Sequence, residues 1–563
     1  MSAPAKWQKT AERRQEMLRL DFDREKAARC HRMAADIALG VNRELSSYST
    51  VTIERTVARL FGVDGVDSHG VPLPNVVVDH VNSLGNLEDG VALHLANACL
   101  ALDEEPQEVA EKVASGRLDF SHLAWQGREA CETKARDLAG AGLVRIAARR
   151  RERESLVEAL PVRKKPWLYV IVATGDIRED VIQARMAASQ GADVIAVIRS
   201  TGQSLLDYVP FGATTEGYGG TYATQENFRL MRAALDEESR KLGRYVRLVN
   251  YCSGLCMPEI AAMGALERLD LMLNDAMYGI LFRDINAERT LVDQRFSRMI
   301  NAYAGIVINT GEDNYLTTVD AMSAGPSVIA SQFINYQFAK ISGLEDGAIG
   351  LGHAFQIDPN VEDSLLYEIA GALLVRELFP DCPVKFMPPT VHKTGDIFFA
   401  HVLDSAFNLV SVLTGQSIHL VGTLTEAIHT PLLQDRYASI SAARYMRNAG
   451  RHLRDSFELA QGGLVTRRAQ DLLARAENLL AQVQARGLMR AIEEGTFAGI
   501  KRRREGGKGR EGVFPKSQWY LNPVEELMRQ ALGLNDALDG GRCDGLDGGR
   551  GDGRGSGREA TGA

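Results

Sequence analysis

Long apolar runs and a framework of closely spaced cysteines are both missing from this sequence. No stretch of about 18 uncharged apolar residues occurs, so no membrane-spanning helix is expected. The first nine residues lack the apolar core of a secretory signal. The net charge is −8, and this mild acidity argues against a general nucleic-acid or membrane-binding surface.

Cysteines number seven in 563 residues and are scattered along the chain. The closest pair, Cys252 and Cys256, has no further metal ligands at short spacing, so the sequence predicts no metal site. Buried reduced thiols in a cytoplasmic protein are the expected state. Hydrophobic residues make up 45% and charged residues 25%, which is typical of a globular protein with several domains or one large barrel with additions.

The first region, residues 1–160, is expected to be helical. Apolar positions recur at helical spacing in 6–39, 52–61 and 91–102. Residues 62–80 contain glycines and prolines, which predict irregular chain rather than regular helix.

After residue 450 the helical spacing of apolar residues returns, and after residue 535 no hydrophobic periodicity is left. Residues 451–535 are expected to be helical, with a strongly amphipathic stretch at 464–483. Residues 502–512 form a basic segment that we expect to be a mobile loop with a structural role. The Gly/Asp/Arg-rich residues 536–563 are expected to be a disordered tail without catalytic groups.

Residues 161–450 alternate short apolar runs with amphipathic helical stretches. Continuous apolar strands alternating with helices imply a parallel sheet covered on both faces. Eight such units fit a (β/α)₈ TIM barrel with additional N- and C-terminal helical segments, and a doubly wound open sheet is the alternative fold. The eight expected strands are 167–173, 194–198, 246–251, 269–273, 305–309, 327–331, 384–387 and 417–421.

The carboxyl ends of barrel strands carry the chemistry, so the residues that follow each run are the candidates. The second run leads into a loop from Arg199 to Gly220 whose cation, hydroxyls and glycines are typical of an anion site. Most other runs also lead into polar or charged residues, and after the sixth run Asn335 is expected at a strand end.

Taken together, these residue types suit an amino acid and a phosphorylated aromatic cofactor. The candidates are Arg199, Arg283 and Lys385 for positive charge, Glu312 and Asp313 for an ammonium group, Ser204, Ser253 and Asn314 for neutral hydrogen bonds, and Tyr278 for a flat aromatic face.

Four long motifs occur in order along the chain. They are Arg199-Ser-Thr-Gly-Gln-Ser-Leu-Leu-Asp-Tyr-Val-Pro, Tyr251-Cys-Ser-Gly-Leu-Cys-Met-Pro-Glu, Asn274-Asp-Ala-Met-Tyr-Gly-Ile-Leu-Phe-Arg-Asp-Ile-Asn and Asn309-Thr-Gly-Glu-Asp-Asn-Tyr-Leu-Thr-Thr. In these motifs, and from about residue 10 to about residue 530, the chain resembles the large (alpha) subunit of lysine 5,6-aminomutase.

The resemblance implies a (β/α)₈ barrel in a hetero-oligomer with a small beta subunit. That subunit would carry the cobalamin domain and the lysine that forms a Schiff base with pyridoxal 5'-phosphate. The enzyme, an isomerase of lysine degradation, would move the terminal amino group of D-lysine or L-β-lysine to the neighbouring carbon. Adenosylcobalamin would supply a 5′-deoxyadenosyl radical, and pyridoxal phosphate would hold the migrating nitrogen as an imine.

The resemblance also implies cofactor contacts, position by position. Arg199 and Ser204 resemble ligands at or near the phosphate of pyridoxal phosphate, and Asn314 resembles a further contact. Ser253 resembles the partner of the pyridine nitrogen, where a neutral hydroxyl leaves that nitrogen unprotonated and suits radical chemistry. Tyr278 resembles the residue packed against the ring.

The catalytic set implied by the resemblance consists of Tyr278 and three charged residues. Arg283, Asp313 and Lys385 resemble the anchors for the carboxylate and α-amino group of the substrate. None of them supplies the radical, and their expected work is to position and protect it.

A cobalamin-binding histidine is not expected in this chain. A domain that binds cobalt through histidine would show Asp-x-His-x-x-Gly, whereas Asp67-Ser-His69-Gly-Val-Pro72 has proline where the last glycine belongs. We therefore expect the cobalamin domain on the partner chain.

Two other functions remain open at this point. One is a self-contained barrel aldolase or lyase with its own Schiff-base lysine, for which Lys385, Lys340 and Lys393 are the candidates. The other is a non-catalytic assembly subunit, which the intact set of candidate residues disfavours.

Overall fold

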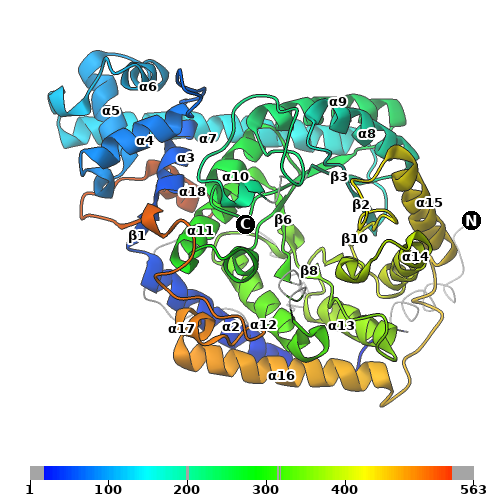
Figure 1. Cartoon of the computed structure of the whole chain (residues 1–563). Helices are drawn as coiled ribbons and strands as arrows, with labels where there is room; N and C mark the ends of the chain where they lie inside the picture. The colour runs from blue at the N-terminus through cyan, green and yellow to red at the C-terminus, as the bar shows by residue number, and fades with distance from the viewer. Residues whose placement is uncertain (1–17, 198–201, 313–315, 317–318, 535–563) are drawn as a thin grey trace, which may run out of the picture.

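Short parallel strands run in a ring at the centre of the molecule (Figure 1). The structure is a computed structural model that describes residues 18–197, 202–312, 316 and 319–534. The strands of the ring are β2 (Trp167–Ile171), β3 (Val194–Val197), β4 (Arg247–Tyr251), β5 (Leu271–Leu273), β6 (Val307–Asn309), β7 (Ile349–Gly350), β8 (Gly352–His353), β9 (Lys385–Phe386) and β10 (Ile418–Leu420).

The ring closes at β7 and β8, which only Leu351 separates. Neighbouring strands follow the order β7-β6-β5-β4-β3-β2-β10-β9-β8, and every pair is parallel. β7 pairs with β6 and β8 pairs with β9, and the Lys385 amide donates to the Leu351 carbonyl at 2.8 Å, so this stretch is one barrel strand. The predicted (β/α)₈ barrel is therefore confirmed.

The sixth strand is not where the sequence predicted it. Residues 327–331 lie inside α12 (Ala321–Lys340), a helix that is buried over most of its length. An apolar run of this kind does not distinguish a buried helix from a buried strand. Pro326 removes the amide that would bond the Met322 carbonyl, and Arg468 donates to that carbonyl instead at 2.8 Å. The helix therefore continues through the proline.

The true sixth strand is glycine-rich because it lies very close to the fifth. A Cβ on Gly350 would lie 2.7 Å from the Ile308 carbonyl oxygen, and a Cβ on Gly352 would collide with the Thr310 carbonyl. Glycine at these two positions allows the strands to pair, but it also removes the Val and Ile pattern that marks a strand in sequence.

Eight helices surround the ring, one after each strand (Figure 1). Their ends follow ordinary capping rules: in α11, Asn286 accepts from the Arg289 amide at the start, and Gly305 ends the helix at φ 64. The eight are α8 (Ile177–Gln190), α9 (Gln225–Leu242), α10 (Met257–Leu266), α11 (Ala287–Ala304), α12, α13 (Ser364–Leu378), α14 (Ile397–Leu413) and α15 (Leu433–Ala449).

Side chains fill the interior of the barrel between its strands. These buried side chains form one apolar cluster and come from five neighbouring strands, β10, β2, β3, β4 and β5. They are Tyr169, Val194, Ala196, Val249, Leu271, Ile418 and Leu420.

The N-terminal region lies on one side of the barrel, where its parts pack against α10, α11 and α12 (Figure 1). Its helices are α2 (Arg24–Leu45), α3 (Val51–Leu60), α4 (Leu73–Ser83), α5 (Val91–Leu102), α6 (Pro106–Ala114) and α7 (Arg128–Ala159), with a short strand β1 (Tyr48–Thr50). The prediction of irregular chain over 62–80 is wrong for its second half, which forms α4. Its prolines stand at the cap and in the first turn, where no amide donor is needed.

The C-terminal segment returns to the same side of the barrel. Its α16 (Leu464–Arg486) packs along α2, α12 and α13, followed by α17 (Leu488–Glu494) and α18 (Pro523–Ala531). Its β11 (Val513–Pro515) pairs antiparallel with β1, so the two ends of the described chain share a small sheet. The predicted tail, 536–563, lies outside the described residues. No helix in the described part of the chain is long and apolar enough to cross a membrane.

Residues 502–512 pack against the barrel instead of forming the free loop that the sequence suggested. Arg502 donates to the carbonyls of Ile280 and Leu281 at 3.1 and 2.6 Å. The Lys508 amide donates to the Asp284 carbonyl at 2.9 Å. These bonds support the turn after β5, which carries two of the predicted site residues.

Candidate functional site

Six of the predicted site residues lie in the described chain. Ser204, Ser253, Tyr278, Arg283 and Glu312 follow barrel strands, and Lys385 is the first residue of the short strand β9. The other three, Arg199, Asp313 and Asn314, lie outside the described residues.

Ser204 and Ser253 stand on adjacent loops whose backbones touch. Ser204 lies in a single 3-10 turn, Gly202–Leu205, after β3, and Ser253 follows β4. The Leu255 amide donates to the Ser204 carbonyl at 3.1 Å. A Cβ on Gly254 would lie 2.8 Å from that carbonyl oxygen, and Gly254 has a φ of +131, so only glycine permits this approach.

The Ser253 hydroxyl is oriented by the backbone of the next loop. Its oxygen accepts from the Asp275 amide at 3.0 Å, while the Leu273 carbonyl lies 3.4 Å away. Because the amide occupies the oxygen as an acceptor and the carbonyl bond is long, the hydroxyl proton is suited to a stronger acceptor. Ser253 can thus offer a neutral hydrogen bond at the mouth.

Tyr278 and Arg283 are brought together by one turn of π-helix, Tyr278–Phe282. The Arg283 Nε donates to the Tyr278 hydroxyl at 2.9 Å, and its guanidinium carbon lies 4.6 Å from the centre of the Phe282 ring. The Tyr251 ring meets Tyr278 edge-on at 5.6 Å. A π-turn is common at functional sites. Within the part of the chain that the structure describes, Arg283 forms no ion pair, so the outer edge of its guanidinium could take a carboxylate.

Lys385 enters the site from the opposite side of the ring. It lies in β9, is buried, and its Nζ donates to Asn309 Oδ1 at the end of β6, 3.3 Å away. The lysine amine thus extends past the intervening β7–β8 strand to the carboxyl end of β6.

A buried polar network lies behind β5 and β6. Asn335 donates to Asp275 Oδ1 at 3.0 Å and to Glu312 Oε1 at 3.1 Å. Arg298 donates to the Asn335 carbonyl at 2.9 Å and to the Asn274 carbonyl at 3.0 Å. Burial raises the pKa of Asp275 and lowers the pKa of Arg298 to about 10. Glu312, a candidate for an ammonium group, is tied into this network.

Asn335 reaches this network from a helix. The sequence placed it at the end of a sixth strand, but it lies in α12, and only its side chain points to the strand ends. Arg298, on α11, was not predicted, because an arginine among alternating polar and apolar residues looks like the exposed side of a helix. No signal in the sequence distinguishes it from the exposed arginines.

Comparison with known proteins gives a consistent result. A family model described as the D-lysine 5,6-aminomutase TIM-barrel domain of the alpha subunit matches residues 20–527. The chain belongs to this family. The lysine 5,6-aminomutase alpha subunit of Fusobacterium nucleatum is 54% identical over 513 residues, which cover 91% of this chain and 99% of that protein. The alpha subunit of Acetoanaerobium sticklandii is 53% identical over 511 residues, or 91% of this chain and 98% of that protein.

A more distant relative is the D-ornithine 4,5-aminomutase subunit beta of Acetoanaerobium sticklandii. It is 28% identical over 375 residues, which cover 64% of this chain and 50% of that protein. The predicted membership of the lysine 5,6-aminomutase alpha-subunit family is confirmed by the two nearly full-length matches.

The lysines proposed for a self-contained Schiff-base enzyme are all engaged in this family member. Lys393 Nζ lies 2.5 Å from Asp404 Oδ1 and 2.7 Å from Glu426 Oε1, and its side chain is fully buried. Lys340 pairs with Asp346 at 3.0 Å, on the outer side of the barrel in α12. The Lys393 amine, held between two carboxylates, is therefore not available as a nucleophile, whereas Lys340 has a single carboxylate partner and Lys385 bonds to the neutral Asn309 amide.

His69 lies in an exposed turn of the N-terminal region, before α4. Asp67 accepts from the amides of His69 and Val71, both at 2.8 Å, so it stabilises its own turn. This geometry needs no cobalt ligand to explain the Asp-x-His spacing.

Proposed function

We propose that this chain is the large subunit of an aminomutase of lysine degradation. It would use adenosylcobalamin and pyridoxal phosphate to move the terminal amino group of D-lysine or L-β-lysine to the neighbouring carbon. The observation that carries the proposal is 54% identity to a lysine 5,6-aminomutase alpha subunit over 99% of that protein's length.

The chemistry of the donors at the mouth supports pyridoxal phosphate as a cofactor. The Ser204 turn and the Ser253 hydroxyl lie on touching loops, and Tyr278 lies on the next loop around the ring. A hydroxyl partner leaves a pyridine nitrogen neutral. When bound, pyridoxal phosphate supplies a conjugated carbonyl that holds the migrating nitrogen, and adenosylcobalamin supplies the organic radical.

The residues of this chain would bind and orient the substrate. Arg283 can take the substrate carboxylate in its fork, and its bond to Tyr278 fixes the plane of that fork. Lys385, whose amine bonds to Asn309 at the end of β6, would supply a second cation. With Asp313 they form the proposed anchors of the carboxylate and the α-amino group. Positioning of this kind also keeps a reactive intermediate away from water.

The partner is part of the proposal. The relatives that match over nearly their full length are named alpha subunits, which supports a second subunit as partner, and the turn at His69 is explained by Asp67. We place the cobalamin domain and the lysine that holds pyridoxal phosphate on that separate small subunit. The chain alone would then be inactive.

The deciding experiment is reconstitution. The chain is co-expressed with a small cobalamin-domain subunit, and the complex receives both cofactors and either D-lysine or L-β-lysine. Formation of the isomer aminated at the neighbouring carbon, detected by mass spectrometry after chromatography, is the expected result. No conversion of either substrate by a complex loaded with both cofactors would refute the proposal.

A second measurement separates the proposal from the aldolase or lyase alternative. Borohydride is added to the chain alone and to the complex, and the modified peptide is sequenced. We expect trapping on the small subunit only. Trapping on Lys385, Lys340 or Lys393 together with activity of the isolated chain would favour the alternative.

A further inference from the structure

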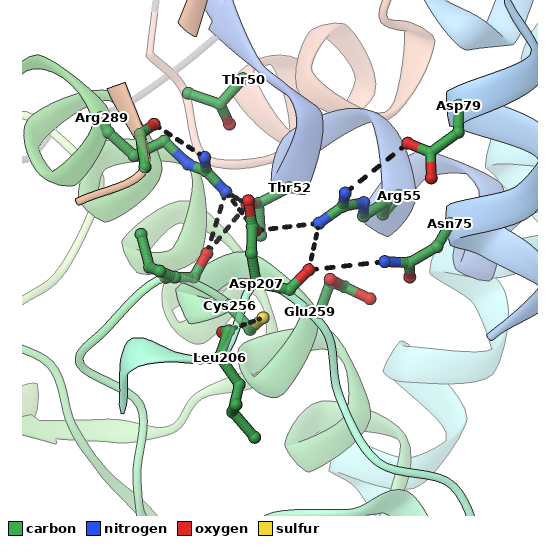
Figure 2. Close-up of polar contacts among 12 residues, drawn as sticks. Thr50, Thr52, Arg55, Asn75, Asp79, Leu206, Asp207, Cys256, Glu259 and Arg289 are labelled. Atoms are coloured by element: carbon green, nitrogen blue, oxygen red, sulfur yellow. Dashed lines mark hydrogen bonds and ion pairs between the residues drawn. The ribbon is translucent and has the colours of Figure 1, made fainter. Parts of the chain in front are cut away.

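Asp207 lies three residues after Ser204, and two guanidinium groups hold its carboxylate (Figure 2). Arg55 Nη1 donates to Asp207 Oδ1 at 2.9 Å, and Arg289 Nη2 donates to the same oxygen at 2.8 Å. The side chain of Arg55 is 7% exposed and that of Arg289 is 0% exposed. Since Arg55 stands on α3 and Arg289 on α11, one carboxylate joins the N-terminal region, the barrel and the Ser204 loop.

The backbone of the same loop is also held from outside. Arg55 Nη1 donates to the Asp207 carbonyl at 2.7 Å, and Asn75 Nδ2, from α4, lies 3.5 Å from that carbonyl. The Cys256 thiol donates to the Leu206 carbonyl at 3.3 Å (Figure 2). The loop after β3 has bonds of its own, such as the Leu206 amide donating to the Gln203 carbonyl at 3.1 Å, and residues 206 and 207 are held in addition by α3, α4 and the N-terminal cap of α10.

The C-terminal segment fixes Arg289 in turn. Arg289 Nη1 donates to the Gly509 carbonyl at 3.1 Å, and its Nε donates to Asp293 Oδ2 at 3.0 Å. A Cβ on Gly512 would collide with this guanidinium, so the segment can approach only with glycine there. The C-terminal region thus acts on the Ser204 loop through one arginine.

Charge in this cluster is closely balanced. Burial would raise the pKa of Asp207, but the charges of Arg289 and Arg55 outweigh burial and lower the pKa below its ordinary value. Without the Asp207 charge, the ionic partner left to Arg55 among the described residues would be Asp79, whose side chain is 62% exposed and 3.8 Å away. A buried cation without a close partner is strongly unfavourable, so the cluster should rearrange around the loop.

We infer that Asp207 is a positioning residue that fixes the turn carrying Ser204, so that the N- and C-terminal regions build the cofactor phosphate site through it. The inference rests on the proposed role of Ser204 in holding that phosphate. It assigns the added helical regions a function at the barrel mouth, although they do not carry the predicted site residues.

The test compares Asp207→Asn with Asp79→Asn. Asp207→Asn keeps the shape of the side chain but removes its charge, whereas Asp79→Asn removes an exposed carboxylate at the edge of the same cluster. Hydrogen exchange is measured on the full chain without cofactor, and pyridoxal phosphate binding is measured by titration of the complex with the small subunit. Asp207→Asn should speed exchange over 202–212 at least about tenfold and weaken binding at least about tenfold, with β5 and α14 unchanged. Asp79→Asn should stay within about twofold of the wild type in both.

Two results would overturn the inference. One is exchange over 202–212 and cofactor affinity that both stay within about twofold in Asp207→Asn. The other is faster exchange spread evenly over the barrel, which marks a general loss of stability. If Asp207→Asn does not fold, Arg55→Gln serves instead, because Arg289 still binds Asp207 in that variant. Arg55→Gln should speed exchange over 202–212 about threefold and weaken pyridoxal phosphate binding about threefold. The absence of both changes would equally refute the inference.

The exchange measurement also separates this inference from the proposed function. If the wild-type complex binds no pyridoxal phosphate, the proposed function fails. Exchange over 202–212, measured without cofactor, then decides by itself whether Asp207 fixes the turn.

Discussion

The loops on the two sides of the barrel mouth are held in different ways. Loops after β3 and β5 are supported by chain from outside the barrel: Arg55 binds Asp207, and Arg502 binds the carbonyls of Ile280 and Leu281. Loops after β9 and β10 are joined by a cluster of their own, in which Lys393 lies between Asp404 and Glu426. Figure 1 shows the added helices beside α10 to α13, away from α14 and α15.

The added terminal regions thus contribute hydrogen bonds to loops on one side of the barrel mouth. A loop of irregular backbone needs partners for its amides and carbonyls, and a bare barrel offers few beyond the strand ends. On one side the terminal regions provide those partners across sequence separations of about 150 and 220 residues. On the other side a buried ion cluster within consecutive barrel units is sufficient.

The largest effect is expected where the outside support is most deeply buried. Arg289→Met leaves Asp207 and the buried Asp293 without their shared cation, at a cost of about 3–5 kcal/mol in unfolding free energy. Urea unfolding measures the change. Arg295→Met, on the same helix but paired more loosely with Glu525 at 3.4 Å, is the control, with a loss of about 1 kcal/mol or less. A loss below about 1 kcal/mol in Arg289→Met would contradict the comparison.

On the other side of the mouth, the cluster of Lys393, Asp404 and Glu426 should make the unfolding free energy depend on pH. Burial raises the pKa of Asp404 from 3.8 to about 7, so the folded chain binds this proton more tightly than the unfolded chain does. Its contribution to stability is present below about pH 4 and is lost as the pH rises to about 7. Asp404→Asn lacks this contribution, so wild type should gain about 2 kcal/mol over the variant on going from pH 8 to pH 5. A difference that does not change between the two pH values would show that Asp404 is not the group responsible.

A smaller effect is expected at the π-turn. Arg502→Met removes two hydrogen bonds to the turn that carries Tyr278 and Arg283, which should lower kcat/KM of the reconstituted complex about tenfold. The unfolding free energy, measured by thermal unfolding, should fall by only about 1 kcal/mol. The neighbouring Arg503, which is exposed, serves as control when changed to Met. Equal kcat/KM in the two variants would show that Arg502 does not support the π-turn in a way that matters for turnover.

The smallest effect is expected at His69, in the N-terminal region but away from the supporting contacts. His69→Ala should leave cobalamin binding and turnover of the complex within about twofold of the wild type, because its side chain is exposed and its turn is held by Asp67. An altered cobalamin absorption spectrum in this variant would assign His69 a role that the geometry does not require.

The errors of prediction have a common physical cause. A buried helix such as α12 and a buried strand both appear as apolar runs in the sequence. The real sixth strand lacks the pattern of a strand, because its close packing requires glycine at positions 350 and 352. Arg289, Arg298 and Asp207 carry no signal in the sequence, because a charged residue in a helix or loop looks the same whether solvent or a buried partner neutralises it. Position after apolar runs and motif placed Ser204, Ser253, Tyr278, Arg283 and Lys385 at the ends of the barrel strands, and their roles stay predictions.

The sequence by itself determined the alternation of strands and helices, the number of barrel units and the family. Those features depend on local periodicity and on contiguous motifs. Only the tertiary structure decided where the sixth strand lies, how β7 and β8 close the ring, and that the terminal regions meet at Asp207 and the π-turn. The reason is that such contacts join residues far apart in the chain, and their energy depends on burial and on the distance between charges.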